Sequence, residues 1–374
     1  MRSALKLAAI LAGSTVVAGC SGSGDTPVPS KYDINKYAIN KTVCNPMGGS
    51  GSNTEPTQGL KASLYYLGAN PPSIYHDVES MITHGHASDE NLFFSELFIP
   101  TRYFTEGFPL QSGGSIKDDV GQELIEYFAL RFTGVLHLGP NEAEGDYQLG
   151  MLSDDGTIWS VSQSETGEDF SIVVNNDGDH PTQMGCGPIV HMTQSTRLNM
   201  KLDYYQGPRY HIALVPMWRR VNSSTSEPLC GHNGNNLYFN PDSNSAPMTA
   251  FNQLLSRGWY PLSVANYSVT ASTDYNPCTS GTTPVISNIQ FALNMESTPD
   301  LTVTWTTDIP ASDQVLFVDQ ATGEETLSPS DNLLKLNHSV GVTVLPHHTY
   351  SIEVISVSDD LGKAISSAQT LIVP

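Results

Sequence analysis

Three observations in the sequence predict an all-β protein of two or three domains. Apolar and polar residues alternate with period two over Phe128–Leu138 and Leu198–Tyr205, as they do in strands with one buried face. Gly, Pro, Asn and Asp separate such runs, and these residues form the tight turns of β-hairpins. The length of 374 residues exceeds the usual size of a single domain.

The first twenty residues have the features of a secretion signal. Arg2 and Lys6 give a basic start, Leu5–Val17 is mostly apolar and small, and Cys20 follows Val-Ala-Gly. The ending resembles the lipobox of bacterial lipoproteins, in which cleavage before the cysteine leaves a lipid-modified residue, here Cys20. Ser21 rather than an acidic residue comes next, which in Gram-negative bacteria indicates the outer membrane.

We therefore expect a lipoprotein signal peptide at residues 1–19 and a lipidated tether, rich in Ser, Gly, Pro and Asn, at residues 20–58. The apolar run of the signal is too short for a durable transmembrane helix, and no other run approaches the ~20 residues that a bilayer requires. The expected location is the bacterial outer membrane, with a lipid anchor. Whether the protein faces the periplasm or the cell surface stays open.

The net charge of −21 excludes one class of partner. Loss of Arg2 and Lys6 with the signal removes two positive charges and makes the mature chain −23. Such a chain repels phosphate backbones, so we expect no nucleic-acid partner. An acidic surface suits solubility and cation binding.

Four further cysteines remain after Cys20, namely Cys44, Cys186, Cys230 and Cys278. An even number in an oxidising compartment predicts disulfides, and three connectivities are possible. We favour Cys44–Cys186 with Cys230–Cys278, because each pair would tie a loop-rich segment to itself or to the neighbouring domain. The cysteines lack C-x-x-C spacing, which argues against zinc binding and thiol redox chemistry.

The first large domain is expected at residues 59–222. It opens on a strand at Leu60–Leu67, and its last strand is Tyr210–Trp218. Between the opening strand and the alternating run from Phe128, the segment Gly68–Val120 has little regular period and a Pro-Pro break. We interpret this segment as an insertion or a set of long loops over the end of the domain.

Two more units follow in the sequence. Residues 223–283 show little alternation and one helix-like patch at Pro247–Arg257, and we expect a bridge stapled by disulfides. Residues 284–374 resemble a fibronectin type III-like (Ig-like) β-sandwich. Trp305, which alternates with threonines, is expected in its core, and Tyr350 in the role of the tyrosine corner.

Residues 59–222 contain a series of motifs around a pair of aspartates. Gly145–Leu149 reads G-x-Y-x-L, Ser153–Gly156 reads S-D-D-G, Val174–His180 is rich in Asp and Asn, and Leu202–Gly207 contains Y-x-x-G. In order and spacing these motifs resemble the PA14 family, a β-sandwich or barrel module of bacterial toxins, yeast adhesins and glycosidase accessory domains. The resemblance implies a PA14-like fold.

The same resemblance implies a cation site. In the adhesin branch of the family, two Asp residues joined by a cis peptide hold Ca²⁺, and the ion ligates sugar hydroxyls directly. Asp154 and Asp155 match these positions. An Asn from a second loop completes the shell in the family, and the matching residue here is Gln206, whose side chain is one methylene longer. Arg209 lies nearby and would repel a cation or bind an anionic ligand.

The residue types also support a calcium site directly, against a simpler alternative. Asp154 and Asp155 lie between two alternating runs, so we expect them at the tip of a strand–loop–strand, facing water, where carboxylates bind Ca²⁺. The alternative is a hairpin turn in which Asp caps backbone N–H groups and Gly156 takes positive φ. Asn175–Asp179 is a second acidic segment, read either as a hydrophilic loop or as a further cation site.

Aromatic residues are the candidate contacts to a sugar ring, since their faces are apolar and their edges polar. Tyr205 and Tyr210 are expected to bind ligand, together with Arg209. Tyr205 alternates with Tyr204, so one of the two should face solvent. Trp159 alternates with apolar neighbours, which favours a place in the core.

A histidine cluster is the other candidate metal site. His84 and His86 would point the same way on a strand and, with His76 and Asp89, could take Zn²⁺, although surface histidines in a loop are the favoured interpretation. The sequence contains no G-x-S-x-G elbow, P-loop or dinucleotide fingerprint. Adjacent aspartates on one turn do not give the carboxylate separation of a glycosidase. We therefore expect a protein that is not an enzyme.

Two functions remain open. The first is an adhesin-like envelope lipoprotein that binds a glycan or surface polysaccharide through calcium. The second is a protein-interaction or envelope-assembly component without a sugar site, whose partner is another envelope protein.

Overall fold

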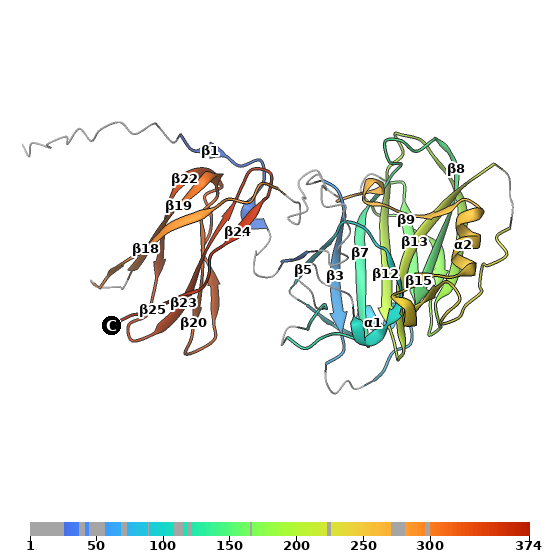
Figure 1. Ribbon diagram of the computed structural model, residues 1–374, viewed down its shortest axis with the longest axis horizontal. Helices are drawn as coiled ribbons and strands as arrows, with labels where there is room; N and C mark the ends of the chain where they lie inside the picture. Colours follow the sequence, from blue (N-terminus) through green and yellow to red (C-terminus); the bar gives the residue numbers. More distant parts are fainter. Residues whose placement is uncertain are drawn as a thin grey trace, which may run out of the picture.

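The computed structural model has two β-rich bodies joined end to end (Figure 1). The prediction of an all-β protein is confirmed, since only two α-helices occur in the described part of the chain. The residues that the structure describes are 26–36, 42–44, 57–68, 73–88, 90–107, 115–118, 121–164, 167–222, 226–270, 281–295 and 300–374. The predicted signal peptide and Cys20 lie outside these residues.

The larger body is a sandwich of two sheets. Its first sheet has nine strands, in the order β10-β9-β12-β7-β3-β5-β2, with β17 beside β7 and β4 beside β3. All neighbours are antiparallel except β2 and β5. The strands are β2 (Thr42–Cys44), β3 (Leu60–Tyr66), β4 (His86–Ala87), β5 (Asn91–Phe94), β7 (Phe128–Leu136), β9 (Thr157–Ser162), β10 (Ser171–Asn176), β12 (Leu198–Gln206) and β17 (Tyr267–Ser268).

The second sheet has the order β11-β8-β13-β16, and β6 also pairs with β13. Apolar residues of the alternating strands fill the space between the two sheets, among them Trp159, Leu202 and Trp218, all fully buried. The core position predicted for Trp159 is confirmed. The strands are β6 (Ile99–Tyr103), β8 (Gly145–Asp154), β11 (Gln183–Met192), β13 (His211–Val221) and β16 (Trp259–Pro261).

The segment interpreted as long loops contributes regular structure instead. It contains α1 (Val78–His84), β4, β5 and β6, and a short 3-10 helix at Phe104–Glu106. Helix α1 covers the outer face of the first sheet, where Val78 and Met81 pack with Tyr205. Tyr204 and Tyr205 are both fully buried, so the expectation that one of them faces solvent is wrong. The alternation on β12 is real, but α1 covers the face that period two assigned to water.

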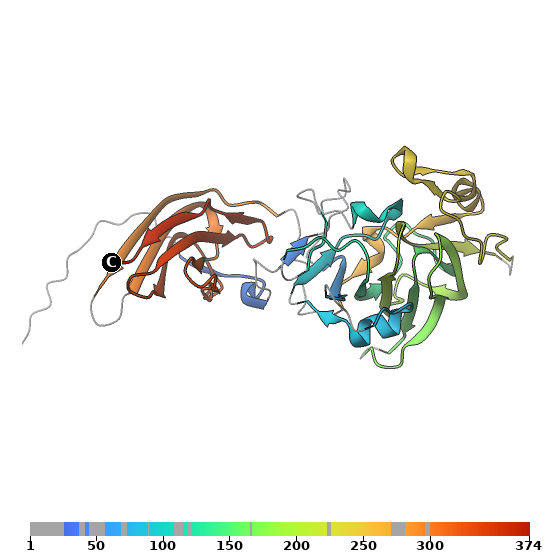
Figure 2. The same cartoon turned by 90° about the horizontal axis from the view of Figure 1, so that it is seen from below.

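The segment expected as a bridge packs on the larger body. It supplies β16 and β17 to the two sheets, a hairpin of β14 (Phe239–Asn240) and β15 (Ala246–Pro247), and helix α2 (Thr249–Ser256). The helix predicted at Pro247–Arg257 is confirmed. Its apolar side chains Phe251 and Leu254 join Trp259 and residues of the second sheet in a separate core cluster. In Figure 2 this part stands out from the sandwich at the upper right.

The cysteine pairing differs from the favoured one. Cys186 is bonded to Cys230, with 5.6 Å between the two Cα atoms. The pairs Cys44–Cys186 and Cys230–Cys278 are therefore wrong, and Cys278 lies outside the described residues. The loop after β13 folds back onto β11, which brings Cys230 to Cys186, a contact that sequence spacing does not encode.

The smaller body is a two-sheet sandwich. One sheet has the order β1-β22-β19-β18, and the other has the order β21-β20-β23-β24 with β25 beside β23. Trp305 is 2% exposed in its core, as predicted, and donates its indole N–H to Ser356 Oγ at 2.9 Å. The strands are β18 (Ile286–Asn294), β19 (Asp300–Ala311), β20 (Gln314–Asp319), β21 (Glu325–Leu327), β22 (Leu333–Thr343), β23 (Thr349–Val357), β24 (Lys363–Ile365) and β25 (Gln369–Ile372).

Tyr350 has the contacts of a tyrosine corner. Its hydroxyl accepts a hydrogen bond of 2.9 Å from the backbone N–H of Leu345, five residues earlier in the chain. This is the bond that defines the motif, and the prediction for Tyr350 is confirmed.

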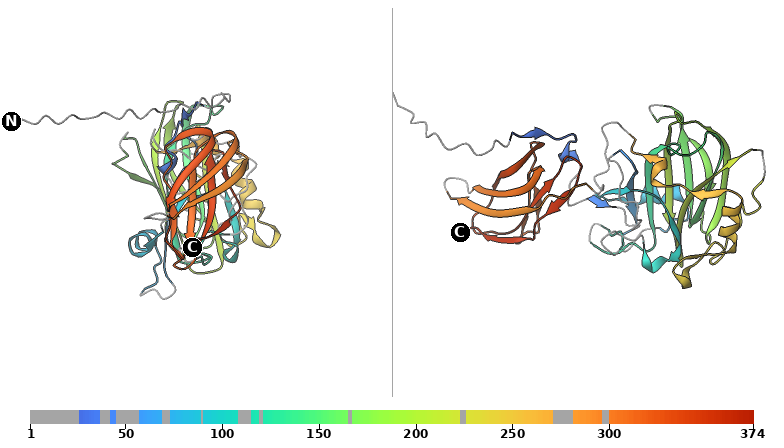
Figure 3. Two further views of the ribbon diagram at one scale, coloured as in Figure 1. Left: turned by 90° about the vertical axis from the view of Figure 1, so that its left-hand side faces the viewer. Right: turned by 45° about the horizontal axis from the view of Figure 1, so that its top comes forward.

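The described N-terminal segment belongs to the smaller body. Strand β1 (Val28–Pro29) pairs antiparallel with β22, at the blue end of the ribbon in Figure 3. Ile34 is buried beside Leu316 and Ile355. The expectation of a simple tether is therefore wrong for residues 26–36. No helix in the described ranges is long and apolar enough to span a membrane.

Candidate functional site

Asp154 and Asp155 lie at the junction of β8 and β9, and a cis peptide bond joins them, as the family resemblance implied. Each is only 4% exposed, which contradicts the expectation of a turn facing water. Gly156 does not take positive φ. It is required for close approach instead, because a Cβ there would lie 2.4 Å from Cε1 of Tyr205.

Both carboxylates are held by hydrogen bonds from neighbouring loops. Asp155 accepts from the backbone N–H of His180 at 3.1 Å and from that of Gly207 at 2.9 Å. Asp154 accepts from the hydroxyl of Thr182 at 3.2 Å. The loop before β11 and the loop after β12 thus fix the orientation of the pair.

Burial controls the electrostatics of this pair. Desolvation raises the pKa of Asp155 to about 7, although the N–H groups of Gly207 and His180 oppose the shift. Desolvation, with the negative charge of Asp155 as a second cause, raises the pKa of Asp154 well above its usual range. Within the described residues, neither carboxylate forms an ion pair with Lys or Arg. In the part of the chain that the structure describes, no lysine or arginine side chain therefore balances the two buried acidic groups.

A pocket of about 270 Å³ lies over the pair. Its size is just below the usual range for small-molecule sites, so it suits one small unit of a ligand. The lining residues come from four loops, and they are Asp154, Asp155, Asp179, His180, Pro181, Pro208, Arg209, Tyr210, His211 and Asn235.

Gln206 and Tyr205, two predicted site residues, lie inside the fold. Gln206 is fully buried. Its Oε1 accepts from the Tyr204 hydroxyl at 2.5 Å, and its Nε2 donates to the backbone oxygen of His211 at 3.0 Å. Tyr205 donates its hydroxyl to Asp179. These contacts position the loop after β12, and neither side chain lines the pocket.

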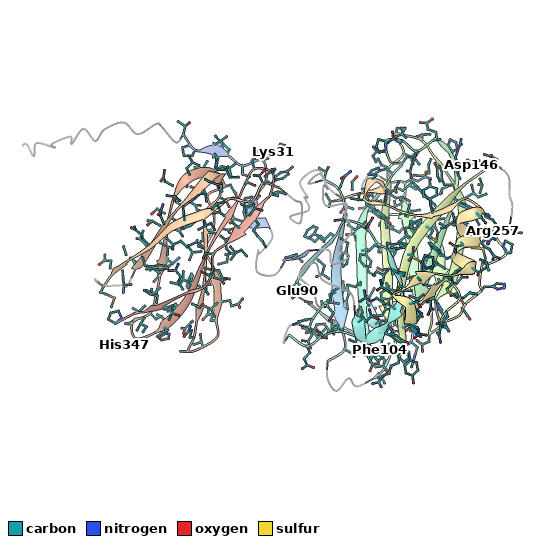
Figure 4. The ribbon with its side chains drawn as sticks, in the orientation of Figure 1. Lys31, Glu90, Phe104, Asp146, Arg257 and His347 are labelled. Atoms are coloured by element: carbon teal, nitrogen blue, oxygen red, sulfur yellow. A yellow bond between two sulfur atoms is a disulfide. The ribbon has the colours of Figure 1, made fainter. Side chains whose placement is uncertain are left out.

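Arg209 and Tyr210 do line the pocket, as predicted, and a second cis peptide joins them. Tyr210 is 68% exposed, so its ring is available to a ligand. The guanidinium of Arg209 is paired with Glu126 at 3.0 Å and lies 5.5 Å from the ring centroid of Phe104. Phe104 marks the lower end of the larger body in Figure 4. The charge of Arg209 is therefore partly balanced by Glu126.

Carboxylate oxygens of the Asn175–Asp179 segment are hydrogen-bonded to other parts of the protein. Asp177 Oδ1 accepts from the N–H of Val78 at 3.0 Å, and Asp179 contacts His76 Nδ1 at 2.6 Å as well as Tyr205. These contacts match the hydrophilic-loop interpretation and tie the loop to the start of α1. Asp179 also reaches the pocket wall.

The histidines of the other candidate metal site are separated. His84 ends α1 and His86 lies in β4, so the two do not share one strand face as expected. Asp89 lies outside the described residues. Among the residues that the structure describes, no group of three or more His, Cys, Asp and Glu side chains has a metal-binding arrangement.

Calcium fits the residues at the pocket floor. The donors of Asp154 and Asp155 are carboxylate oxygens, the ligands that hard cations prefer. Their raised pKa values reflect burial of negative charge, which a divalent cation would offset. Further oxygen ligands would have to come from amide groups, backbone carbonyls or the bound ligand.

The prediction missed several residues of the site, among them one that bonds Asp154 and one that lines the pocket. Thr182, which bonds Asp154, follows a Pro in a segment without periodicity, and Asn235 comes from the segment interpreted as a bridge. Asn235 lies 80 positions after Asp155 in the numbering. The disulfide between Cys186 and Cys230 ties these segments together, whereas the sequence analysis favoured a different pairing.

No family model matches the chain, and no protein of curated function matches it. Several solved structures do match. The PA14 domain of the antifreeze protein MpAFP is 14% identical, with 46% of this chain and 87% of that chain covered and a TM-score of 0.33. The PA14 sugar-binding domain of an RTX adhesin is 17% identical, with coverages of 46% and 94% and a TM-score of 0.33.

The A domain of Epithelial Adhesin 6 from Candida glabrata, solved with Galb1-3GlcNAc, is 12% identical, with coverages of 48% and 87% and a TM-score of 0.32. The all-β class rests on the strands themselves.

Proposed function

We propose that this protein is a lipid-anchored envelope protein that binds a glycan through calcium held by Asp154 and Asp155. The observation that carries the proposal is the pair of buried carboxylates on the floor of a small pocket, held by fixed backbone donors. When bound, calcium would supply a Lewis-acidic centre for sugar hydroxyls. The chain itself fixes the two carboxylates and keeps their charges close together.

The pocket wall supports a sugar as ligand. Tyr210 exposes most of its ring, and aromatic faces stack on the apolar faces of sugar rings. The lining also includes Asp179 and His180, which offer polar groups to hydroxyls. A sugar unit bound over the ion would place its hydroxyls at the polar floor of the pocket and its apolar ring face against Tyr210.

Calorimetric titration of Ca²⁺ into the chelator-stripped chain from Ser21 onward tests the cation site. We expect saturable heat that the Asp154→Asn/Asp155→Asn variant loses. The chain offers a matched control, because Ser358-Asp359-Asp360 repeats the S-D-D sequence at an exposed loop of the smaller body. The Asp359→Asn/Asp360→Asn variant should bind calcium as the native chain does.

A glycan array, probed with calcium and then with chelator, tests the sugar part of the proposal. Glycan signals that vanish with chelator, and in the Asp154→Asn/Asp155→Asn variant, are the expected result. Saturable calcium binding with no glycan retained would overturn the sugar part. Co-purification of one stable envelope protein in that case would favour the interaction function.

The anchor belongs to the same proposal. Docking of Val28 and Ile34 on the smaller body supports an arrangement in which that body lies next to the membrane. The eight steps of chain from Cys20 to Val28 span at most roughly 28 Å. Metabolic labelling with a palmitate analogue should mark the native protein and not a Cys20→Ala variant.

A further inference from the structure

One side chain of the pocket comes from a part of the chain unrelated to the paired aspartates. Nine lining residues fall between Asp154 and His211, and the tenth is Asn235. We call residues 226–235 the arm. It follows β13 in the chain, and its last residue, Asn235, lines the pocket.

The arm is fastened to the strand that follows the pocket. Cys230 is disulfide-bonded to Cys186 of β11. Beyond the disulfide, the N–H of Gly231 donates to Met184 O at 2.7 Å, and the N–H of Gly234 donates to Thr182 O at 3.1 Å. The arm therefore lies beside the start of β11, where Asn233 forms an isolated antiparallel bridge with Gln183, and it ends at Asn235.

Thr182 connects the arm to the pocket floor. Its backbone oxygen accepts from Gly234, while its side-chain hydroxyl donates to Asp154 at 3.2 Å. The same hydroxyl contacts Thr101 Oγ1 of β6 at 2.7 Å. The position of the arm and the orientation of the Asp154 carboxylate thus depend on one fully buried residue.

Asn235 is directed at the pocket by a second contact. Its side chain is hydrogen-bonded to His211, another lining residue. The His211 ring stacks on Tyr103, with 5.4 Å between ring centroids, and the Tyr103 hydroxyl donates to Asp242. The rim is therefore a continuous set of contacts between β6, β13 and the segment after the disulfide.

The chemistry of Asn235 suits a sugar. A side-chain amide offers both a donor and an acceptor, which match the donor and acceptor capacity of a hydroxyl. Gln206, the amide expected at the site, is buried and already bonded to Tyr204 and His211. Asn235 is the only side-chain amide among the residues that line the pocket.

We propose that Asn235 is a specificity-determining residue that contacts the bound sugar, and that the Cys186–Cys230 disulfide holds it in place. This inference rests on the proposed glycan function and extends it to a segment outside the sequence motifs that surround the paired aspartates. Reduction of the disulfide would then weaken sugar binding while the calcium site stays intact.

The test compares full-length variants on one glycan array and in calcium calorimetry. Asn235→Ala should lower affinity for the best glycan roughly tenfold, the loss of about one hydrogen bond to a ligand, and should change the rank order of glycans. Calcium affinity should be unchanged. Asn236→Ala, an exposed neighbour outside the pocket lining, is the matched control and should bind as the native chain does.

The disulfide is tested by Cys186→Ala/Cys230→Ala, with calorimetric unfolding to confirm that the sandwich stays folded. It should weaken the same glycans as Asn235→Ala. Equal affinity and rank order in the native chain and Asn235→Ala would overturn the inference and leave the proposed function standing. A native chain that binds no glycan at all would overturn both.

Discussion

Asn35 and Ser330, 295 positions apart in the chain, exchange two hydrogen bonds of 2.8 Å. Asn35 Nδ2 donates to the backbone oxygen of Ser330, and the N–H of Ser330 donates to Asn35 Oδ1. Next to this pair, Ile34 is buried against Leu316 and Ile355. The segment after the predicted anchor is therefore part of the smaller sandwich.

Removal of these contacts should destabilise the smaller sandwich. Ile34→Ala should lower its free energy of unfolding by about 2–5 kcal/mol, the usual cost of a deleted buried Ile side chain. Asn35→Ala should cost about 1 kcal/mol. Differential scanning calorimetry of the full chain measures both. Lys31→Ala is the control, because it keeps the backbone N–H of residue 31 that bonds to Asp359. An unchanged thermogram for Ile34→Ala would contradict the packing of this segment on the smaller sandwich.

Calcium affinity should fall as the pH drops below 7. The pKa of Asp155 is raised to about 7, so below that pH the cation must displace a proton. We expect roughly a tenfold weaker affinity per pH unit for one displaced proton. Titration calorimetry at several pH values checks this. An affinity that stays constant from pH 7.5 to 5.5 would contradict it.

The stability of the metal-free protein should change with pH in the opposite direction to the calcium affinity. Because the folded pKa of Asp155 lies above its ordinary value of 3.8, the folded state binds more protons than the unfolded state between these values. Stability therefore falls as the pH rises from about 4 to 7. Thermal unfolding in chelator should report this loss, and the Asp154→Asn/Asp155→Asn variant should lack it.

Glu227 should stabilise the folded chain at the base of the arm. Its carboxylate is fully buried and accepts from Arg219, from Arg257 at 2.5 Å and from the indole N–H of Trp259 at 3.0 Å. Glu227→Gln should lower the free energy of unfolding by about 3–5 kcal/mol, the usual result of breaking a buried ion pair. Urea denaturation measures this, with the exposed Glu168→Gln as control.

The Glu227 carboxylate should also make the free energy of unfolding depend on pH. Burial alone would raise the pKa of Glu227, but bonds from Arg257, the Leu229 N–H and Trp259 bring it below its ordinary value of 4.5. A lowered folded pKa means stability that is present above 4.5 and lost as the pH falls through the folded value. Glu227→Gln should flatten this part of the stability curve.

Gln206 should act as a positioning residue. Its amide bridges Tyr204 and the backbone of His211, and Asn is too short to make both contacts. Gln206→Asn should therefore lower the free energy of unfolding by about 1–3 kcal/mol, even in chelator. If Gln206 were a calcium ligand, the shorter Asn would strengthen calcium binding, and that result would contradict the geometry. Urea denaturation and calcium titration of Gln206→Asn distinguish a positioning role from a role as calcium ligand.

Local sequence patterns were sufficient to predict burial where the surroundings of a residue follow from the strand in which it lies. The alternation around Trp159 and Trp305 predicted both core positions, and the resemblance to a fibronectin type III-like sandwich predicted the tyrosine-corner role of Tyr350. Period two reports which residues share a face. It does not report whether a helix covers the other face, and α1 buries Tyr205 for that reason.

Pairs that are distant in sequence were not predictable in this way. The favoured cysteine pairs were wrong because loop spacing does not decide which loops meet. Asn235 reaches the pocket only because the arm folds back along β11, and Asn35 reaches Ser330 across nearly the whole chain. Such contacts depend on how completed sheets pack.

The sequence by itself determined the all-β class and the main strands, and it singled out Asp154 and Asp155 as candidate ligands. It could not distinguish this pair by composition from Asp359 and Asp360, which follow a Ser in the same way. Tertiary structure decided the difference, because loops from three other parts of the chain enclose the first pair and leave the second exposed. Burial removes water from the first pair and raises both of its pKa values, and a carboxylate in that state needs a cation or a proton.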